Sequence, residues 1–233
     1  NIALGANTSG LLAGDKVNAY FLTEDPLPPH VMTTATVQLT SADGSTWTGS
    51  IPSGAPFTFP TAGGTQYIGF TAIRQSDGKA NSILSVPAIT FCNNPAPGNT
   101  GPPTCTMSAG VPSISTPVAV SPTSVPLNPD GTLFVGATLT ITATTSNVYA
   151  STTASDSVIA VVETQAGASQ VVLKPTCSLT STLTACNTWK VTIDSTMALR
   201  FAAGPQKIAV IANQVASAPY STASALSGTV TFS

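Results

Sequence analysis

The chain has 233 residues, of which 7% are charged and 42% are hydrophobic, and its formal net charge at pH 7 is −2. Typical soluble domains carry about 25% charged residues, so a polar but nearly uncharged surface is expected. Such a surface does not attract nucleic acid or an anionic membrane, and the sequence has no apolar run long enough to span a bilayer. Little repulsion between copies favours self-association.

Short β-prone runs separated by turn signals occupy the first part of the chain. The predicted strands are residues 17–22, 36–40, 47–51, 67–72 and 82–91. Asp43-Gly44 predicts a turn directly before the strand that opens at Trp47. No window shows a helical period with caps, so these patterns indicate an all-β unit.

A Pro- and Gly-rich segment, residues 93–104, cannot form a helix or a strand and is predicted to be a linker. The four cysteines, Cys92, Cys105, Cys177 and Cys186, lack the spacing of a zinc site. The four cysteines allow three disulfide pairings. The nearest-neighbour pairing is favoured because each pair then closes one loop, and Cys92–Cys105 would pinch the linker into a stiff joint. Disulfides indicate an oxidising compartment, so we expect an extracellular or cell-surface protein.

The second part of the chain repeats the plan of the first. Its predicted strands are residues 137–143, 158–162, 170–173, 189–193, 206–213 and 229–232. Trp47 and Trp189 lie 142 residues apart, and Phe91 and Phe232 lie 141 residues apart. An offset that stays nearly constant over such a length predicts a duplicated structural unit.

These patterns together predict two β-sandwiches, residues 1–92 and residues 105–233, joined by the linker 93–104. Trp47 and Trp189 open matching strands, so we expect both rings in the cores. The alternative, a platform on which a sugar stacks, requires an exposed ring.

The first half also carries an ordered series of motifs. They are Gly14-Asp15-Lys16-Val17, Trp47-x-Gly49-x-Ile51, Tyr67-x-x-Phe70-x-Ala72 and the polar turn 77–82. This series resembles the bacterial immunoglobulin-like domains of extracellular adhesins and secreted proteins. The second half matches in part, through Trp189-x-x-x-Ile193 and Ile208-x-Val210-x-Ala212, but residues 216–224 lack the Asp and Gly of the turn. The resemblance implies tandem immunoglobulin-like sandwiches and says little about function.

Few residues could take part in catalysis or bind a metal ion, and no enzyme activity or cofactor is predicted. The single histidine, His30, follows a proline-rich loop and has no sequence-visible catalytic partners. Glu24, Asp25 and Asp77 are candidate calcium ligands if their loops gather at one end of the sandwich, although turn aspartates explain them equally well. Asn7 lies in the only N-glycosylation sequon.

The absence of an active site favours a structural subunit of an extracellular filament, pilus or surface assembly made of copies of the chain. Donation of a terminal strand to a neighbour would join the copies. The candidate donor residues are Ile2 and Leu4 at the start and Val230 and Phe232 at the end. They could instead belong to each domain's own outer strands.

Two other functions stay open. One is an adhesin or binding module that holds a surface glycan or a protein through residues 25–31 and 143–157. The other is an accessory region of a secreted enzyme. The chain starts at Asn1 rather than Met, which fits removal of a signal peptide or trimming.

Overall fold

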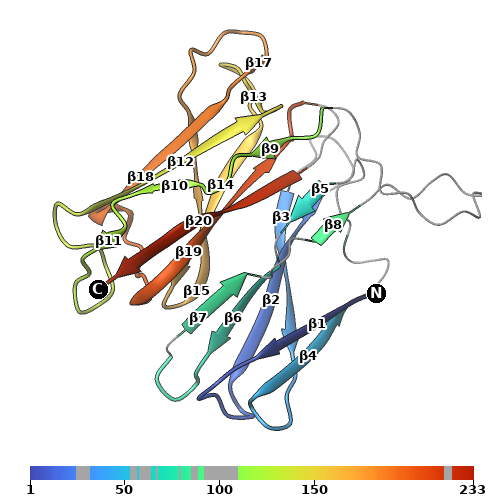
Figure 1. Cartoon of the computed structure of the whole chain (residues 1–233), viewed down its shortest axis with the longest axis vertical. Helices are drawn as coiled ribbons and strands as arrows, with labels where there is room; N and C mark the ends of the chain where they lie inside the picture. Colours follow the sequence, from blue (N-terminus) through green and yellow to red (C-terminus); the bar gives the residue numbers. More distant parts are fainter. Residues whose placement is uncertain are drawn as a thin grey trace, which may run out of the picture.

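A computed structural model describes residues 1–24, 32–52, 57, 64–66, 68–78, 80–84, 89–91, 110–217 and 222–233. Within these ranges the chain is all-β, as predicted, with one short 3₁₀ helix, η1 (Ser195–Met197), and no α-helix. Figure 1 shows the strands of the first half packed beside those of the second half rather than separated from them.

The first half forms two sheets around one core. Strand β1 (Ile2–Asn7) pairs antiparallel with β4 (Thr46–Ile51), and the second sheet has the order β3-β2-β6-β7. The bounds of these four strands are Lys16–Glu24 for β2, Met32–Leu39 for β3, Gly69–Ile73 for β6 and Ala80–Leu84 for β7. Strand β4 alternates as a strand with one buried face should, because Trp47 and Ile51 are buried while Thr46 and Thr48 are exposed.

The second half has the same two layers with additional strands. One sheet pairs β12 (Thr138–Ser146) with β18 (Thr188–Asp194), and the other has the order β15-β14-β19-β20. The latter strands are β14 (Ser157–Thr164), β15 (Gly167–Val172), β19 (Gly204–Asn213) and β20 (Thr222–Phe232). Four short strands extend the sheets: β9 (Ser113–Ile114), β10 (Ala119–Ser121), β11 (Ser124–Val125) and β16 (Lys174–Pro175). Two others, β13 (Tyr149–Ala150) and β17 (Thr184–Ala185), form a separate two-stranded sheet.

The repeat seen in the sequence reappears in the strand pairing. In the smaller sheets, Ala6 pairs with Trp47 and Ala143 pairs with Trp189. In the larger sheets, β2 lies between β3 and β6, as β14 lies between β15 and β19. Strand β7 pairs with β6, as β20 pairs with β19, so the fourth strand has the same place in both sheets. Six strands of each half therefore share one topology.

One sheet runs across both halves, which the sequence did not predict. Strands β5 (Gly64–Gln66) and β8 (Ile89–Phe91) pair with each other, and β5 pairs with β20 of the second half at Thr222. Figure 1 shows β5 and β8 beside the start of β20. Both strands fall within the predicted first domain, so backbone hydrogen bonds cross the expected boundary. The proposed linker itself lies outside the described residues.

Side-chain packing also joins the halves. Ile159, Val161, Ala209 and Ile211 on β14 and β19 form a buried cluster against which Tyr20 of β2 packs. The opposite face of the same two strands lies in the main core of the second half. This sheet is therefore covered on both faces, which accounts for the nearly unbroken burial along β14.

Candidate functional site

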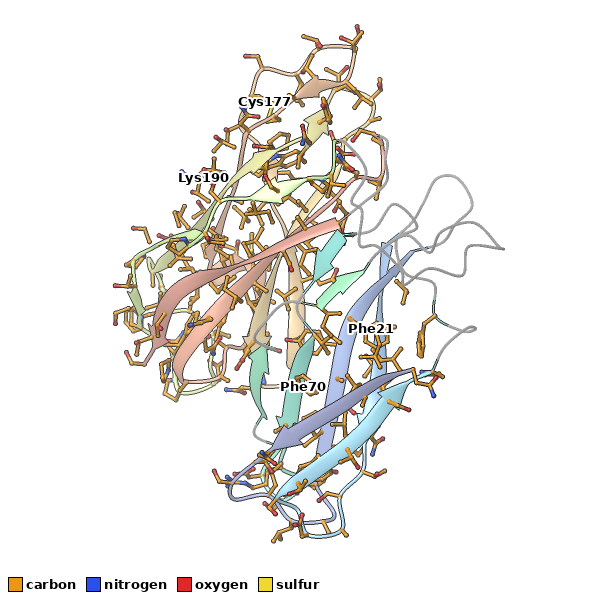
Figure 2. The ribbon with its side chains drawn as sticks, turned by 45° about the vertical axis from the view of Figure 1, so that its right-hand side comes forward. Phe21, Phe70, Cys177 and Lys190 are labelled. Atoms are coloured by element: carbon orange, nitrogen blue, oxygen red, sulfur yellow. A yellow bond between two sulfur atoms is a disulfide. The ribbon has the colours of Figure 1, made fainter. Side chains whose placement is uncertain are left out.

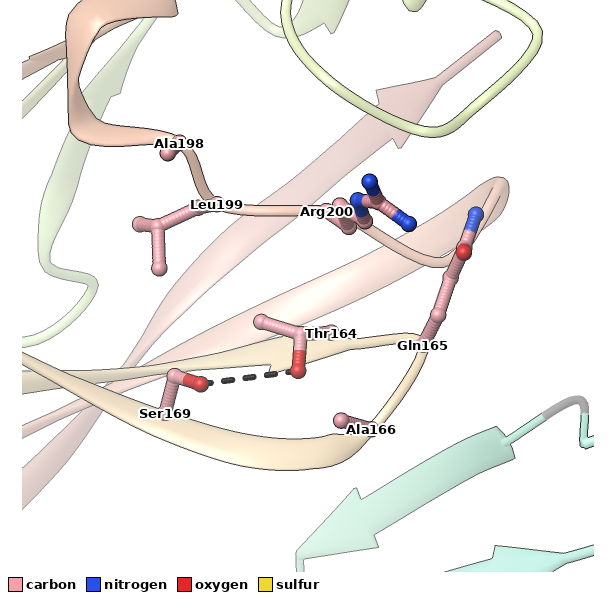
Figure 3. A pocket seen from close by; sticks show the side chains of 7 residues that line it. All are labelled: Thr164, Gln165, Ala166, Ser169, Ala198, Leu199 and Arg200. Carbon is pink, nitrogen blue, oxygen red and sulfur yellow. Dashed lines mark hydrogen bonds between the residues drawn. The ribbon is translucent and has the colours of Figure 1, made fainter.

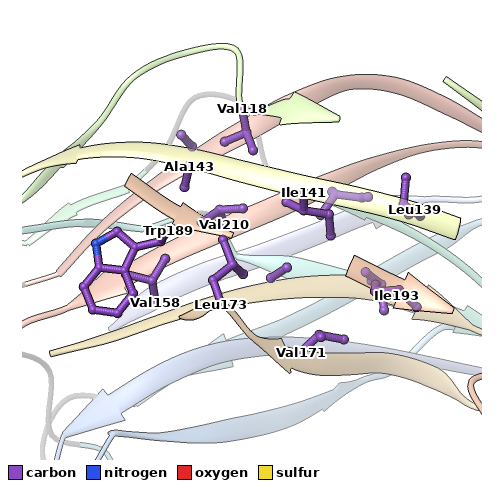
Figure 4. Packing of buried hydrophobic residues seen from close by; sticks show 14 of the residues in the cluster. Val118, Leu139, Ile141, Ala143, Val158, Val171, Leu173, Trp189, Ile193 and Val210 are labelled. Atoms are coloured by element: carbon purple, nitrogen blue, oxygen red, sulfur yellow. The ribbon is translucent and has the colours of Figure 1, made fainter. Parts of the chain in front are cut away.

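Both tryptophans are core residues, as predicted, with exposed fractions of 2% for Trp47 and 1% for Trp189. The indole Nε1–H of Trp47 donates to the backbone carbonyl of Gly44 at 3.1 Å, and that of Trp189 donates to the carbonyl of Cys186 at 2.9 Å. Each acceptor lies three residues before its tryptophan. Figure 4 shows Trp189 packed beside Val158 in the main core. Neither ring is available to stack on a sugar.

Buried carboxylates occur at matching places in the two halves. Asp15 Oδ2 accepts from the Leu12 backbone N–H at 2.8 Å, and its Oδ1 accepts from the Gln75 N–H at 2.8 Å. These backbone donors, first Leu12 and then Gln75, hold the pKa of Asp15 below its ordinary value of 3.8. The carboxylate of Asp156 accepts backbone N–H bonds from Tyr149 and from residues 215–217, and also the hydroxyl of Ser217.

Exposed aspartates serve as turn residues. Asp43 Oδ1 accepts from the Thr46 and Ser45 N–H groups and from the Ser41 hydroxyl, and these bonds, led by Thr46, lower its pKa well below 3.8. Asp130 and Asp194 each accept from a threonine two residues later, which also lowers their pKa. The sequence signals, Asp-Gly and Asp-x-Thr, are those of ordinary turns.

The predicted calcium ligands are not brought together by the part of the chain that the structure describes. Asp77 forms an ion pair with Arg74 at 3.3 Å. Asp25 and the side chain of Glu24 lie outside the described residues. Among described residues, no group of three or more His, Cys, Asp or Glu side chains could hold a metal ion.

The disulfide predicted between Cys177 and Cys186 is present, with a Cα–Cα distance of 5.6 Å. It closes a loop in which Leu179 and Leu183 are exposed. Figure 2 labels Cys177 at the base of this loop, far from the first half. Cys92 and Cys105 lie outside the described residues.

The candidate assembly residues all belong to strands paired within the chain. Ile2 and Leu4 lie on β1, which is bonded to β4, and Leu4 is buried in the first core. Val230 and Phe232 lie on β20 and are buried in the main core. Asn7, the glycosylation candidate, is exposed at the end of β1.

Only one of the two candidate binding loops lies within the described residues. Residues 25–31, with His30, lie outside the described part of the chain. Residues 143–157 include the end of β12, strand β13 and a turn in which Ser151 Oγ accepts from the Ala154 N–H at 2.9 Å. Within the turn, Thr152 and Thr153 are exposed.

A shallow pocket lies where the turn between β14 and β15 meets the segment before β19 (Figure 3). Its volume is about 390 Å³, and its described lining residues are Thr164, Gln165, Ala166, Ser169, Ala198, Leu199 and Arg200. Arg200 and Gln165 form a polar side and Leu199 lies on an apolar side. The lining contains no carboxylate, imidazole or thiol. It offers a cation, an amide and two hydroxyls for binding, but no general base.

Exposed large hydrophobic side chains are the other notable surface feature of the described residues. They are Leu12, Phe134, Val135, Val172, Leu179, Leu183 and Met197. The sequence could not identify them, because the same residue types fill the cores.

Compared with known proteins, the chain matches no family model and no curated sequence. Within the described residues, no helix has both the length and the apolar character needed to cross a membrane.

Proposed function

We propose that this chain is a non-enzymatic structural subunit of an extracellular filament, pilus or surface assembly, built from two tandem immunoglobulin-like sandwiches. The observation that carries the proposal is the position of exposed leucines at both ends of the longest dimension. At one end, the disulfide-closed loop around β17 exposes Leu179 and Leu183. At the other end, the turn between β1 and β2 exposes Leu12, whose exposed fraction is 73%.

Exposed leucines from different segments at opposite ends favour a head-to-tail contact between copies. A contact between unlike surfaces repeats without closing unless its rotation happens to close a ring, so it generates linear assemblies. A formal net charge of −2 produces little repulsion between successive copies. The disulfide restricts the loop that carries two of the leucines, which lowers the entropy lost when that loop is held in a contact.

Addition of a strand from a neighbour is the finer part of the proposal. Among the described strands, β1 pairs only with β4, and no described strand pairs with its other edge, to which a partner strand could add. Strand β20 is bonded along β19 on one edge and to β11 on the other. This difference supports an assembly role for the edge of β1, near Ile2 and Leu4, over a role for the C-terminal strand.

The test is negative-stain microscopy together with light scattering of the purified chain across a concentration series. We expect linear assemblies from the native sequence and discrete particles from a Leu179→Ser, Leu183→Ser variant. Val172→Ser is the matched control, because Val172 is exposed on the outer strand β15 rather than at either end. Monomers of the native chain at every concentration, or equal loss of assembly in the control, would contradict the proposal.

The pocket beside Arg200 favours a second candidate function, a binding module for a small ligand with a carboxylate and an apolar part. Arg200 supplies the positive charge and Leu199 the apolar wall. Titration with short-chain carboxylates, followed by protein NMR, tests it. Shifts at residues 164–169 and 198–200 that disappear in Arg200→Gln would support binding, and their absence in the native chain would exclude this class of ligand.

A further inference from the structure

Two of the seven cationic residues of the chain stand directly opposite each other on neighbouring strands. Lys174 of β16 is the register partner of Lys190 of β18, and both side chains are exposed on the outer face of the sheet. Residues opposite each other in an antiparallel pair have Cβ atoms about 5 Å apart, and like charges in that position repel. Figure 2 shows Lys190 on the side of the second half that faces away from the first half.

No carboxylate of the described residues balances this pair. Neither lysine forms an ion pair within 4.0 Å with a described residue. Asp194 lies four residues along β18 from Lys190, which is roughly 13 Å for an extended strand, and its Oδ1 already accepts from Thr196. The two ammonium groups therefore present an uncompensated positive charge in a chain that is otherwise poor in charge.

Hydroxyl groups surround the lysine pair on the same flat face. Thr142 of β12 is the register partner of Lys190 on its other side. Thr140 pairs with Thr192 in the next row, where their Oγ1 atoms are 3.1 Å apart. Thr176 lies against Thr188 in the row on the other side, since its backbone N–H donates to the Thr188 carbonyl at 3.0 Å. The face combines two cations with a field of hydroxyls and has no aromatic platform in its described part.

We propose that this face, defined by Lys174, Lys190 and the adjacent Thr142, binds an anionic polysaccharide, one that carries sulfate esters or uronic carboxylates. Each ammonium group has three N–H donors for an anionic oxygen, and the threonine hydroxyls donate to or accept from sugar hydroxyls. An anion between the two lysines removes their mutual repulsion, so binding gains from both contacts. A polymer is the fitting ligand, because a single exposed anion would bind weakly and repeated groups add to the apparent affinity.

The lysine pair lies on β16 and β18, beside the base of the disulfide-closed loop and not on the loop residues that expose Leu179 and Leu183. Its test measures polysaccharide binding rather than assembly, so the inference stands or fails independently of the proposed assembly. Binding is measured with the full, oxidised chain on sensors coated with dextran sulfate, with alginate as a polyuronate, or with neutral dextran. Low and high salt are compared for each coating. We expect binding to one or both anionic polymers, none to neutral dextran, and loss of binding as salt screens the charges.

Matched variants distinguish binding by this face from a general effect of the positive charges of the chain. Lys174→Gln with Lys190→Gln should weaken binding about tenfold. Lys16→Gln with Lys207→Gln removes the same charge from two exposed lysines elsewhere and should leave binding nearly unchanged. Lys174→Arg with Lys190→Arg retains both charges and should retain binding, which checks that the face is intact.

Three outcomes would overturn the inference. One is that the native chain binds neither anionic polymer, and another is that the two Gln pairs weaken binding equally, which would indicate general electrostatics. The third is that the lysine pair proves necessary for salt-sensitive association between copies but not for polysaccharide binding. The face would then meet another copy of the chain.

Discussion

Asp15 and Asp156 occupy the same structural position in the two halves, 141 residues apart. Each precedes by two residues the first buried valine of a central strand, Val17 on β2 and Val158 on β14. Each uses Oδ1 to accept a backbone N–H from the turn after the partner strand, and Oδ2 to accept one from the segment that precedes it in the chain. A buried acid thus ties two connecting segments to the start of a central strand of the larger sheet in each half.

The two carboxylates differ in how many donors they satisfy, which predicts unequal effects of removing them. Asp156 accepts five hydrogen bonds and Asp15 accepts two. We expect Asp156→Ala to lower the free energy of unfolding by about 3 kcal/mol, because buried N–H groups lose a charged acceptor, and Asp15→Ala to lower it less. Urea unfolding measures both. Asp156→Asn, which keeps one acceptor oxygen, should recover part of the loss, and equal losses in the two Ala variants would refute this ranking.

Gly69 and Tyr20 are predicted to be coupled. They are register partners on β6 and β2, and a Cβ at Gly69 would overlap the Tyr20 ring. Gly69→Ala would therefore displace the ring, which packs against the cluster of Ile159 and Val161 on the second half. We expect Tyr20→Ala to cost about 2 kcal/mol through lost packing and Gly69→Ala to cost about 1.5 kcal/mol through the displaced ring.

A double-mutant cycle tests this coupling. With Tyr20 already replaced by Ala, Gly69→Ala should cost almost nothing, so the coupling energy should be about 1.5 kcal/mol. Gly78→Ala is not a suitable control because its φ is 69°. Gly14→Ala is preferable, since a Cβ there meets nothing within 4 Å. Additive costs at Gly69 and Tyr20 would show that the ring does not depend on the glycine.

Much of the fold could be predicted from local pattern, but the joining of the halves could not. The turn at Asp43 and the alternation along β4 follow from short-range chemistry, and the structure has both. The unbroken apolar run at 158–162 predicts a strand. Such a run also indicates a sheet covered on both faces, and here the second cover is Tyr20 of the other half. Identifying that cover requires a long-range contact that sequence periodicity does not encode.

Some features of the candidate sites could likewise be predicted from the sequence, and others could not. The core positions of Trp47 and Trp189 and the pairing of Cys177 with Cys186 could be predicted from repeat position and spacing. The opposition of Lys174 and Lys190 could not, because it depends on the register of a two-residue strand. A shift of that register by one residue would place Lys174 on the other face of the sheet.

Acid should destabilise the chain through its turn aspartates. Hydrogen bonds to the Thr46 and Ser45 N–H groups hold the pKa of Asp43 well below 3.8 in the folded state. The stability contributed by a lowered pKa is complete above the unfolded value and is lost as the pH falls toward the folded value. Asp43→Asn should therefore be less stable than the native chain at neutral pH, with a difference that shrinks below about pH 4. Urea midpoints measured from pH 7 to pH 2 check this, and parallel curves for the two proteins would exclude it.

Removing the disulfide of the second half should destabilise the chain mainly by freeing a loop in the unfolded state. Cys177 and Cys186 are nine residues apart, and closure of so short a loop contributes about 2.5 kcal/mol in the chain-entropy model. We expect Cys177→Ala with Cys186→Ala to lower the urea midpoint by the corresponding amount. The single variant Leu183→Ser is the control, because it alters an exposed residue of the same loop while the bond stays closed. Since the Trp189 indole donates to the backbone carbonyl of Cys186 rather than to its sulfur, the wavelength of maximum tryptophan emission should stay unchanged in the cysteine variant, while the intensity should rise because the disulfide beside the indole no longer quenches it. A shift of that emission would show that the bond also fixes the core around Trp189.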